Sequence, residues 1–187
     1  MRLFIAIDLN EAARDAIAAE QARLKKAIGD RSSLKWVRDE QTHLTLVFLG
    51  EVSDDGAPRV IETIERPLAR SPFDASFEGI GMFPPHGAPR VLWVGVAAGA
   101  QEMIAVQREL AGRVRQLGIT LEDRPFHPHL TLARWRESGA ADRRRVGEAA
   151  SATTIARIHV DHATLYRSRL SPSGSTYTPL ARATLSA

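Results

Sequence analysis

His43-Leu44-Thr45-Leu46 and His129-Leu130-Thr131-Leu132 are two copies of one tetrapeptide in a single chain. Because a strand sends alternate side chains to opposite faces, each copy places His and Thr on one face and both Leu on the other. The Leu pair then anchors the strand in a core, and an imidazole that exchanges a proton near neutral pH stands beside a hydroxyl. A single His-x-Thr strand is common and typical of a partly exposed sheet face. The repetition favours instead a pocket with two histidines and two threonines.

The surroundings of the two copies repeat as well. An apolar run of strand length at 3–7 and a helical pattern at 11–28 precede the first copy. A similar run at 90–96 and a second helical pattern at 101–117 precede the other. The two histidines lie 129 − 43 = 86 residues apart, close to half the chain. We therefore expect a duplicated unit whose two lobes are related by an approximate twofold axis, with both His-Thr pairs facing one cleft.

The remaining pattern supplies further elements. Asp8 and Asn10 are interpreted as turn or capping residues ahead of the first helix. A Ser/Pro/Gly-rich stretch at 171–175 predicts a turn. Helices are expected after 53–55 and at 142–150, and short strands at 34–37, 73–82, 155–160, 163–170 and 177–185.

Composition excludes several classes of protein. A chain of 187 residues with 44% hydrophobic content can bury a full core. It contains no cysteine, which removes disulfides, thiolate nucleophiles and cysteine-based zinc sites. We find neither a signal peptide nor an apolar run of membrane-spanning length, so we expect a cytoplasmic protein. The net charge of +3 permits a nucleic-acid substrate without arguing for it.

These motifs together resemble the 2H phosphoesterase superfamily, which is named for two H-x-T/S motifs. Within it the chain is most similar to the bacterial RNA 2′,3′-cyclic phosphodiesterases, also described as 2′-5′ RNA ligases. The resemblance covers essentially the whole chain. It departs at 39–42, where the family often carries Glu-Asn just before the first motif. The stretches that carry the resemblance are 2–7, 36–37, 43–50, 89–96, 126–134 and 165–170.

The resemblance implies an α+β fold with two antiparallel sheets around a central cleft and helices packed outside. It would be one domain, 1–187, of two lobes with interleaved chain and repeat halves of roughly 1–85 and 86–187. It also implies an enzyme, an RNA 2′,3′-cyclic phosphodiesterase, that works as a monomer on RNA ends, with tRNA fragments among the candidate substrates.

For the chemistry, one histidine acts as general base on water and the other as general acid on the leaving ribose oxygen. By similarity to the family, His43 is the proton donor and His129 the proton acceptor, and the product is a 2′-phosphate. Thr45 and Thr131 are placed to donate hydrogen bonds to the phosphate oxygens. No metal or cofactor is needed, and the reversed reaction would join RNA ends through a 2′-5′ linkage.

Other residues leave alternatives open. Arg134 is a candidate phosphate clamp, but it lies five residues after His129, so simple alternation puts it on the opposite face unless the strand bends. Phe48 and Trp93 can stack on a base, although strand aromatics usually belong to the core. His127 shares parity with His129, but no carboxylates at suitable spacing support zinc.

Two other functions are compatible with the same motifs. One is a 2H phosphodiesterase for 2′-5′ oligoadenylate or another small cyclic phosphate, with the same chemistry and a different pocket. The other is a noncatalytic module that binds RNA ends. Loss of a motif histidine would favour the module, and both histidines are present.

Overall fold

Along the chain, helices separate groups of one to three strands. A computed structural model describes residues 1–29, 33–171 and 174–186. Its helices are α1 (Glu11–Ile28), α2 (Ala57–Glu65), α3 (Ala100–Gln116) and α4 (Ala140–Ala149), with a 3-10 turn η1 (Asp39–Gln41). The strands are β1 (Arg2–Ile7), β2 (Leu34–Trp36), β3 (Leu44–Glu51), β4 (Phe73–Phe83), β5 (Val91–Val96), β6 (His129–Trp135), β7 (Thr154–Val160), β8 (His162–Ser171) and β9 (Gly174–Thr184).

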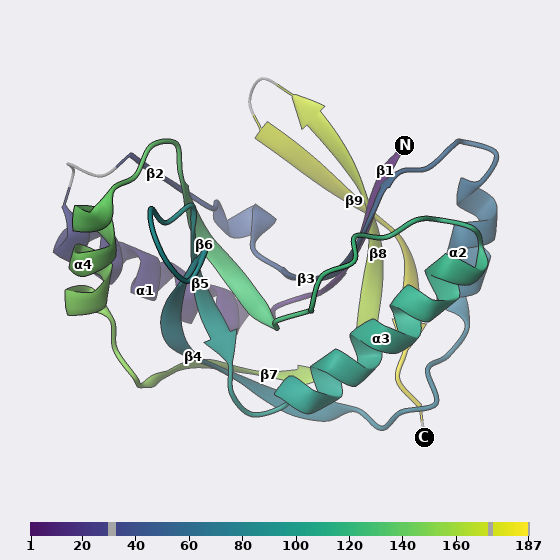
Figure 1. The fold of residues 1–187 in the computed structure, drawn as a ribbon. Helices are drawn as coiled ribbons and strands as arrows, with labels where there is room; N and C mark the ends of the chain where they lie inside the picture. Colours follow the sequence, from purple (N-terminus) through teal and green to yellow (C-terminus); the bar gives the residue numbers. More distant parts are fainter. Residues whose placement is uncertain (30–32, 172–173, 187) are drawn as a thin grey trace.

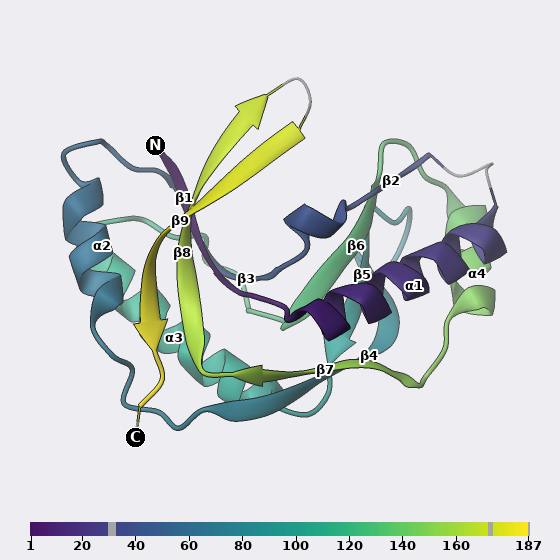
Figure 2. The same ribbon diagram turned by 180° about the vertical axis from the view of Figure 1, so that it is seen from behind.

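The strands form two antiparallel sheets, one in each lobe. The order is β3-β1-β8-β9 in the four-stranded sheet and β2-β6-β5-β4-β7 in the five-stranded sheet. The two motif strands, β3 and β6, contact each other where the lobes meet. From there they diverge, one into each lobe (Figures 1 and 2). The expected α+β fold of two lobes with helices on the outside is confirmed.

Two of the helices cross between the lobes. Helix α1 follows β1 of the four-stranded sheet but packs against β7 and α4 of the other lobe. Helix α3 follows β5 of the five-stranded sheet but packs against β3 and α2 (Figure 2). The exchange is reciprocal, which is what an approximate twofold axis between duplicated units requires.

Helix α1 begins and ends at the predicted residues. The Asn10 side chain accepts a 2.8 Å hydrogen bond from the backbone N–H of Ala13, so Asn10 is the N-cap. Its buried stripe includes Ile17 and Leu24, spaced as the 3.6-residue period requires. None of the helices within the described ranges is long and apolar enough to cross a membrane.

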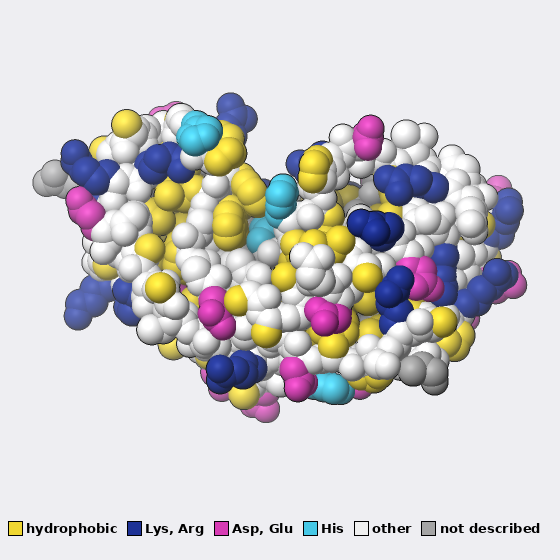
Figure 3. All heavy atoms as spheres, turned by 60° about the horizontal axis from the view of Figure 1, so that its bottom comes forward, with side chains coloured by type: hydrophobic (Ala, Val, Ile, Leu, Met, Phe, Trp, Pro, Cys, Tyr) yellow, Lys and Arg dark blue, Asp and Glu magenta, His cyan; other side chains and the backbone are white. Residues whose placement is uncertain are grey.

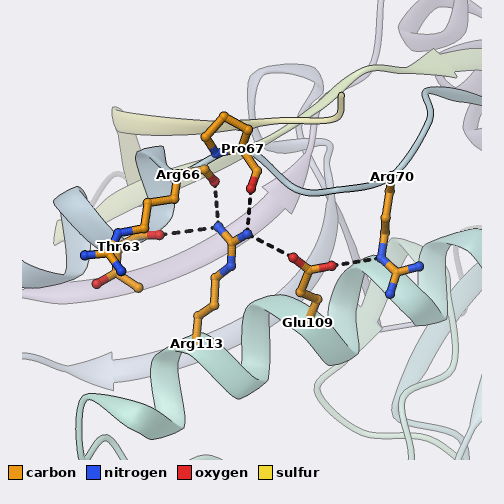
Figure 4. A network of polar contacts seen from close by, with 6 residues as sticks. All are labelled: Thr63, Arg66, Pro67, Arg70, Glu109 and Arg113. Atoms are coloured by element: carbon orange, nitrogen blue, oxygen red, sulfur yellow. Dashed lines mark hydrogen bonds and ion pairs between the residues drawn. The ribbon is translucent and has the colours of Figure 1, made fainter. Parts of the chain in front are cut away.

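One arginine ties α3 to the end of α2. The Arg113 guanidinium donates to the carbonyl oxygens of Arg66 (2.5 Å) and Pro67 (2.7 Å), which follow the last turn of α2 (Figure 4). Glu109 accepts from Arg113 at 2.9 Å and from Arg70 at 3.0 Å. Helix termini leave carbonyl groups without intrahelical partners, and here a charged donor from the neighbouring helix satisfies such groups.

Strands β8 and β9 form a long hairpin that extends past the other strands of its sheet (Figure 1). Of the turn predicted at 171–175, residues 172 and 173 lie outside the described residues. At its base, Ser171 Oγ donates to the carbonyl of Gly174 at 2.8 Å. Leu170, near the end of β8, is 68% exposed.

Candidate active site

A cavity of about 520 Å³ lies between the lobes. His43, Thr45, Thr131 and Arg134 all line it. His129 precedes Thr131 by two residues on the same strand face. The surface is hollowed between the lobes, and hydrophobic and histidine side chains gather there (Figure 3). Four of the five predicted site residues therefore share one cavity, and the fifth adjoins it. The remaining lining residues are Arg2, Leu3, Phe4, Lys35, Trp36, Val37, Gln41, Phe48, Ser168, Leu170, Ser175 and Tyr177.

A β-bulge decides where Arg134 points. In the pairing of β5 with β6, Trp93 lies opposite Thr131 and Leu92 lies opposite Ala133, so Leu132 is an extra residue. Both Leu132 and Ala133 are fully buried. The bulge reverses the alternation and returns Arg134 to the face of Thr131. The alternative in which the strand bends is therefore the one the structure adopts.

The first motif strand has the same bulge. In the pairing of β1 with β3, Ala6 lies opposite Thr45 and Ile5 lies opposite Val47, which leaves Leu46 as the extra residue. Phe48 thereby faces the cavity, and it is 50% exposed. The interpretation of Phe48 as a core residue, which followed the usual place of strand aromatics, is wrong, because the bulge turns this ring toward the cavity.

The ring of His129 is fixed by its own backbone. Its Nδ1 lies 2.7 Å from the carbonyl oxygen of His127. A carbonyl can only accept, so Nδ1 carries the hydrogen and Nε2 of the neutral ring keeps its lone pair. Phe83 contacts the ring edge-on with centroids 5.1 Å apart, and Trp93 lies 6.1 Å away. Burial lowers the pKa of His129 below its ordinary value, and the nearby Arg134 charge lowers this pKa further.

His43 has an equivalent environment in the other lobe. Its ring stacks on Phe4 with centroids 4.9 Å apart, and Tyr177 contacts it edge-on at 5.1 Å. A backbone hydrogen bond to Gln41, again two residues earlier, holds the imidazole. Burial lowers the pKa of His43 to about 4, while the carboxylate of Asp8 acts in the opposite direction.

Asp8 is a partly buried acceptor beside this site. It follows β1, whose last residue pairs with Leu44, so it lies next to His43 in the strand ladder. Its carboxylate accepts from Thr164 Oγ1 at 2.7 Å and from Tyr166 Oη at 2.6 Å. These bonds differ from the turn or capping role that we predicted. Nothing local in the sequence indicates them, since both donors lie more than 150 residues away.

Gln41 connects the β8–β9 hairpin to the first motif. Its side-chain Nε2 donates to the carbonyl of Ser175 at 2.6 Å, and its own backbone holds His43. Thr42, which is buried, donates from Oγ1 to the Arg38 carbonyl at 3.0 Å and stabilises the turn between them. The sequence drew attention to 39–42 as a departure from the family pattern, but it did not indicate this contact.

Trp93, considered for base stacking, and His127, considered for metal binding, both contact neighbouring residues of the fold. Trp93 lies against Gly81 of β4, where an added Cβ would come within 2.2 Å of the indole ring. His127 holds the His129 ring through its backbone carbonyl. Within the described ranges, no group of three or more His, Asp or Glu side chains is placed to hold a metal ion.

Fold and site together define a phosphoesterase-type scaffold with one His-x-Thr motif per lobe. The chain belongs to the 2′-5′ RNA ligase superfamily, whose family model matches residues 12–171. The family resemblance stated from the two motifs is confirmed.

Curated relatives and solved structures agree with this membership. An RNA 2′,3′-cyclic phosphodiesterase of Archaeoglobus fulgidus is 32% identical over 96% of this chain and 98% of its own length. The RNA 2′,3′-cyclic phosphodiesterase of Methanothermobacter thermautotrophicus is 34% identical over 96% of this chain and 96% of its own length. Escherichia coli LigT complexed with 3′-AMP superimposes with a TM-score of 0.78 at 28% identity and covers 100% of this chain and 98% of its own. TT0787 of Thermus thermophilus superimposes with a TM-score of 0.77 at 29% identity, over 98% of this chain and 97% of its own.

Proposed function

We propose that this protein hydrolyses 2′,3′-cyclic phosphates at RNA ends to 2′-phosphates by metal-independent general acid/base catalysis. The observation that carries the proposal is the matched environment of His43 and His129. Each ring is held by the backbone two residues before it, in a cleft that also presents Thr45 and Thr131. The curated relatives are named for this activity, as RNA 2′,3′-cyclic phosphodiesterases.

The proposed step moves two protons. Nε2 of His129 takes a proton from water as the water oxygen bonds to phosphorus. The bond from phosphorus to O3′ breaks, and His43 delivers a proton to O3′. The products are a 2′-phosphate and a free 3′-hydroxyl, and a proton exchange with solvent restores both rings. Thr45, Thr131 and Arg134 donate to the non-bridging oxygens, where charge builds up.

The shifted pKa values fit the two roles differently. A lowered pKa keeps His129 neutral at pH 7, as a general base requires. His43 must be protonated to act as the acid, although burial opposes its charged form in the free protein. An anionic phosphate bound against the ring favours the imidazolium, so substrate binding prepares the acid.

With an RNA 5′-hydroxyl in place of water, the same attack gives a 2′-5′ phosphodiester. This ligation is the second part of the proposal, and it uses the same two histidines. That the enzyme is a cytoplasmic monomer stays a prediction of the sequence.

The test is hydrolysis in EDTA of a short RNA that ends in a 2′,3′-cyclic phosphate. Wild type, His43→Ala and His129→Ala are compared, with the exposed loop variant His86→Ala as the matched control. We expect a 2′-phosphate from wild type and His86→Ala, and losses on the order of 10²–10⁴-fold in each motif variant.

Other results would contradict the proposal in distinct ways. Activity only after a divalent metal is added would refute the metal-free mechanism. Binding of RNA ends without cleavage would support the noncatalytic module. Faster cleavage of 2′-5′ oligoadenylate or of a small cyclic phosphate than of the RNA would support the alternative phosphodiesterase.

A further inference from the structure

The two walls of the cleft differ in chemistry. On the β6 side, Arg134, Lys35 and Trp36 line the cavity, and on the opposite side Phe48, Tyr177 and Leu170 do so beside Arg2. No Asp or Glu of the described residues is among the lining side chains. Single-stranded nucleic acids bind in grooves that combine cations for the backbone with aromatic surfaces for the bases. The cleft has both kinds of surface, and two of the three Lys and Arg side chains that line it lie on the β6 side.

Lys35 and Arg134 are neighbours across two strands. They pair directly in the antiparallel ladder of β2 with β6, so their side chains leave the sheet on the same face. Both side chains are exposed. In the part of the chain that the structure describes, neither side chain forms a hydrogen bond or an ion pair. Like charges directly opposite each other are destabilising. An anion between them would remove that repulsion.

Sheet edges often carry a lysine that prevents pairing with another chain, and β2 is an edge strand. That role requires only a charge at the edge. It does not account for a lysine that lines the cavity beside the proposed phosphate clamp. The chain has three lysines, and the other two, Lys25 and Lys26, lie together in the last turn of α1.

We propose that Lys35, beside Arg134, forms a second phosphate subsite. Its ligand is the phosphodiester that joins the terminal nucleotide of the RNA to the preceding one. The inference rests on the proposed function and refines it, because it makes an oligonucleotide, and not a mononucleotide, the preferred substrate. Arg134 lies three residues from Thr131, whereas Lys35 lies one strand further from the motif, so a chain leaving the reacting phosphate along this wall passes Arg134 before Lys35.

The experiment removes the charge of Lys35 in the protein and the charge of the phosphodiester linkage in the substrate. Three substrates are compared: adenosine 2′,3′-cyclic phosphate, the dinucleotide ApA with the same cyclic end, and that dinucleotide with an uncharged methylphosphonate linkage. Wild type is expected to prefer the charged dinucleotide. Lys35→Gln should lower kcat/KM for this substrate roughly tenfold more than for the other two, the low end for a hydrogen bond to a charged group. Lys26→Gln, on exposed α1 surface, is the matched control.

Salt dependence gives an independent measurement. Each phosphate contact with a single strand contributes a slope of about 0.7 in the dependence of log affinity on log salt. Lys35→Gln should reduce the magnitude of this slope by about that amount for the charged dinucleotide. Titration calorimetry with the corresponding mono- and dinucleotide 2′-phosphates measures this binding without turnover, and thermal melting confirms that the variant is folded.

Failure of the proposed function and failure of the proposed subsite give different results. If wild type cleaves none of the three substrates, the proposed function fails, and calorimetry alone then decides whether the subsite exists. If Lys35→Gln weakens all substrates equally, or if wild type does not discriminate among them, the subsite is refuted while the proposed function stands.

Discussion

Phe48 and Arg134 occupy equivalent positions in the two motif strands. Each lies five residues after its histidine and returns to the cleft because a bulged leucine precedes it. The duplicated scaffold therefore presents an aromatic ring on one wall and a guanidinium on the other. The histidines and threonines are the same in the two lobes, whereas these two positions differ. The cleft is therefore asymmetric, with Phe48 on one wall and Arg134 on the other.

This difference predicts unequal effects of substitution. Arg134→Ala should lower kcat/KM by about 10²-fold, as loss of a donor to developing charge does. Arg134→Lys should recover only part of the activity, because an ammonium cannot make bidentate contacts. Phe48→Leu should chiefly raise KM, by about 5- to 100-fold if one base stacks there. Steady-state kinetics on a cyclic-phosphate RNA measures all three, and equal losses in kcat for Phe48→Leu and Arg134→Ala would contradict the division of roles.

The carboxylate of Asp8 predicts a change in pH dependence. It raises the pKa of His43 against the effect of burial, so Asp8→Asn should lower that pKa. Less His43 is then protonated, and kcat/KM at neutral and alkaline pH should fall about tenfold for each pKa unit lost. The deficit should shrink as the pH falls.

Profiles from pH 3 to 8.5 test this expectation, because the deficit shrinks clearly only below the His43 pKa of about 4. His162 Nε2 lies 3.8 Å from a carboxylate oxygen of Asp8, and the Arg14 charge also acts on His43, so both groups remain in the variant. Asp74→Asn, which removes an exposed carboxylate paired with His159, is the control. A uniform loss at every pH would mean that Asp8 has only a structural role.

Burial of His43 predicts that the fold weakens in mild acid. The folded pKa of about 4 lies below the unfolded value of 6.5, so between these pH values the unfolded chain binds more protons. Stability is therefore lost as the pH falls from 6.5 toward 4. Between pH 7 and pH 5 this group contributes a loss of about 2 kcal/mol, which His43→Gln should remove. Urea unfolding at both pH values measures it, and His86→Gln should behave as wild type.

The bond from Gln41 to Ser175 predicts that the hairpin affects the first histidine. In Gln41→Leu the donor to the Ser175 carbonyl is lost and no charge is added to the cleft that Gln41 lines, so the η1 turn should shift and His43 with it. We expect kcat to fall by roughly tenfold while KM changes little, since a displaced catalytic group mainly affects the chemical step. Gln101→Leu, on the exposed start of α3, is the control. Reduced melting temperature with unchanged kcat and pH profile would exclude a positioning role.

Gly81 and Gly112 form a pair with opposite expectations. A Cβ at Gly81 would lie 2.2 Å from the Trp93 ring, so Gly81→Ala should displace the indole beside His129 and destabilise the fold by about 1–3 kcal/mol. A Cβ at Gly112, inside α3, meets nothing within 4 Å. Gly112→Ala should therefore stabilise by about 0.5–1 kcal/mol. Thermal unfolding of both variants tests the pair, and a stable, fully active Gly81→Ala would show that this contact does not support His129.

The amino-acid sequence by itself determined the elements and the motif faces. Periodicity gave α1 to the residue, and the strict alternation of His-Leu-Thr-Leu placed Leu44 and Leu130 in the core, because both signals are local. The duplication into two lobes followed from the repeated order of elements, and the α+β fold from the family resemblance. The proposed boundary of the repeat halves near residue 85 stays a prediction.

Only the tertiary structure decided which further residues reach the cleft. A bulge depends on a partner strand far along the chain, so alternation alone put Arg134 on the wrong face, and the usual place of strand aromatics put Phe48 in the core. The donors to Asp8 come from β8, and the acceptor for Gln41 comes from β9. Such contacts join segments more than 130 residues apart, and they form only when the four-stranded sheet assembles from both ends of the chain.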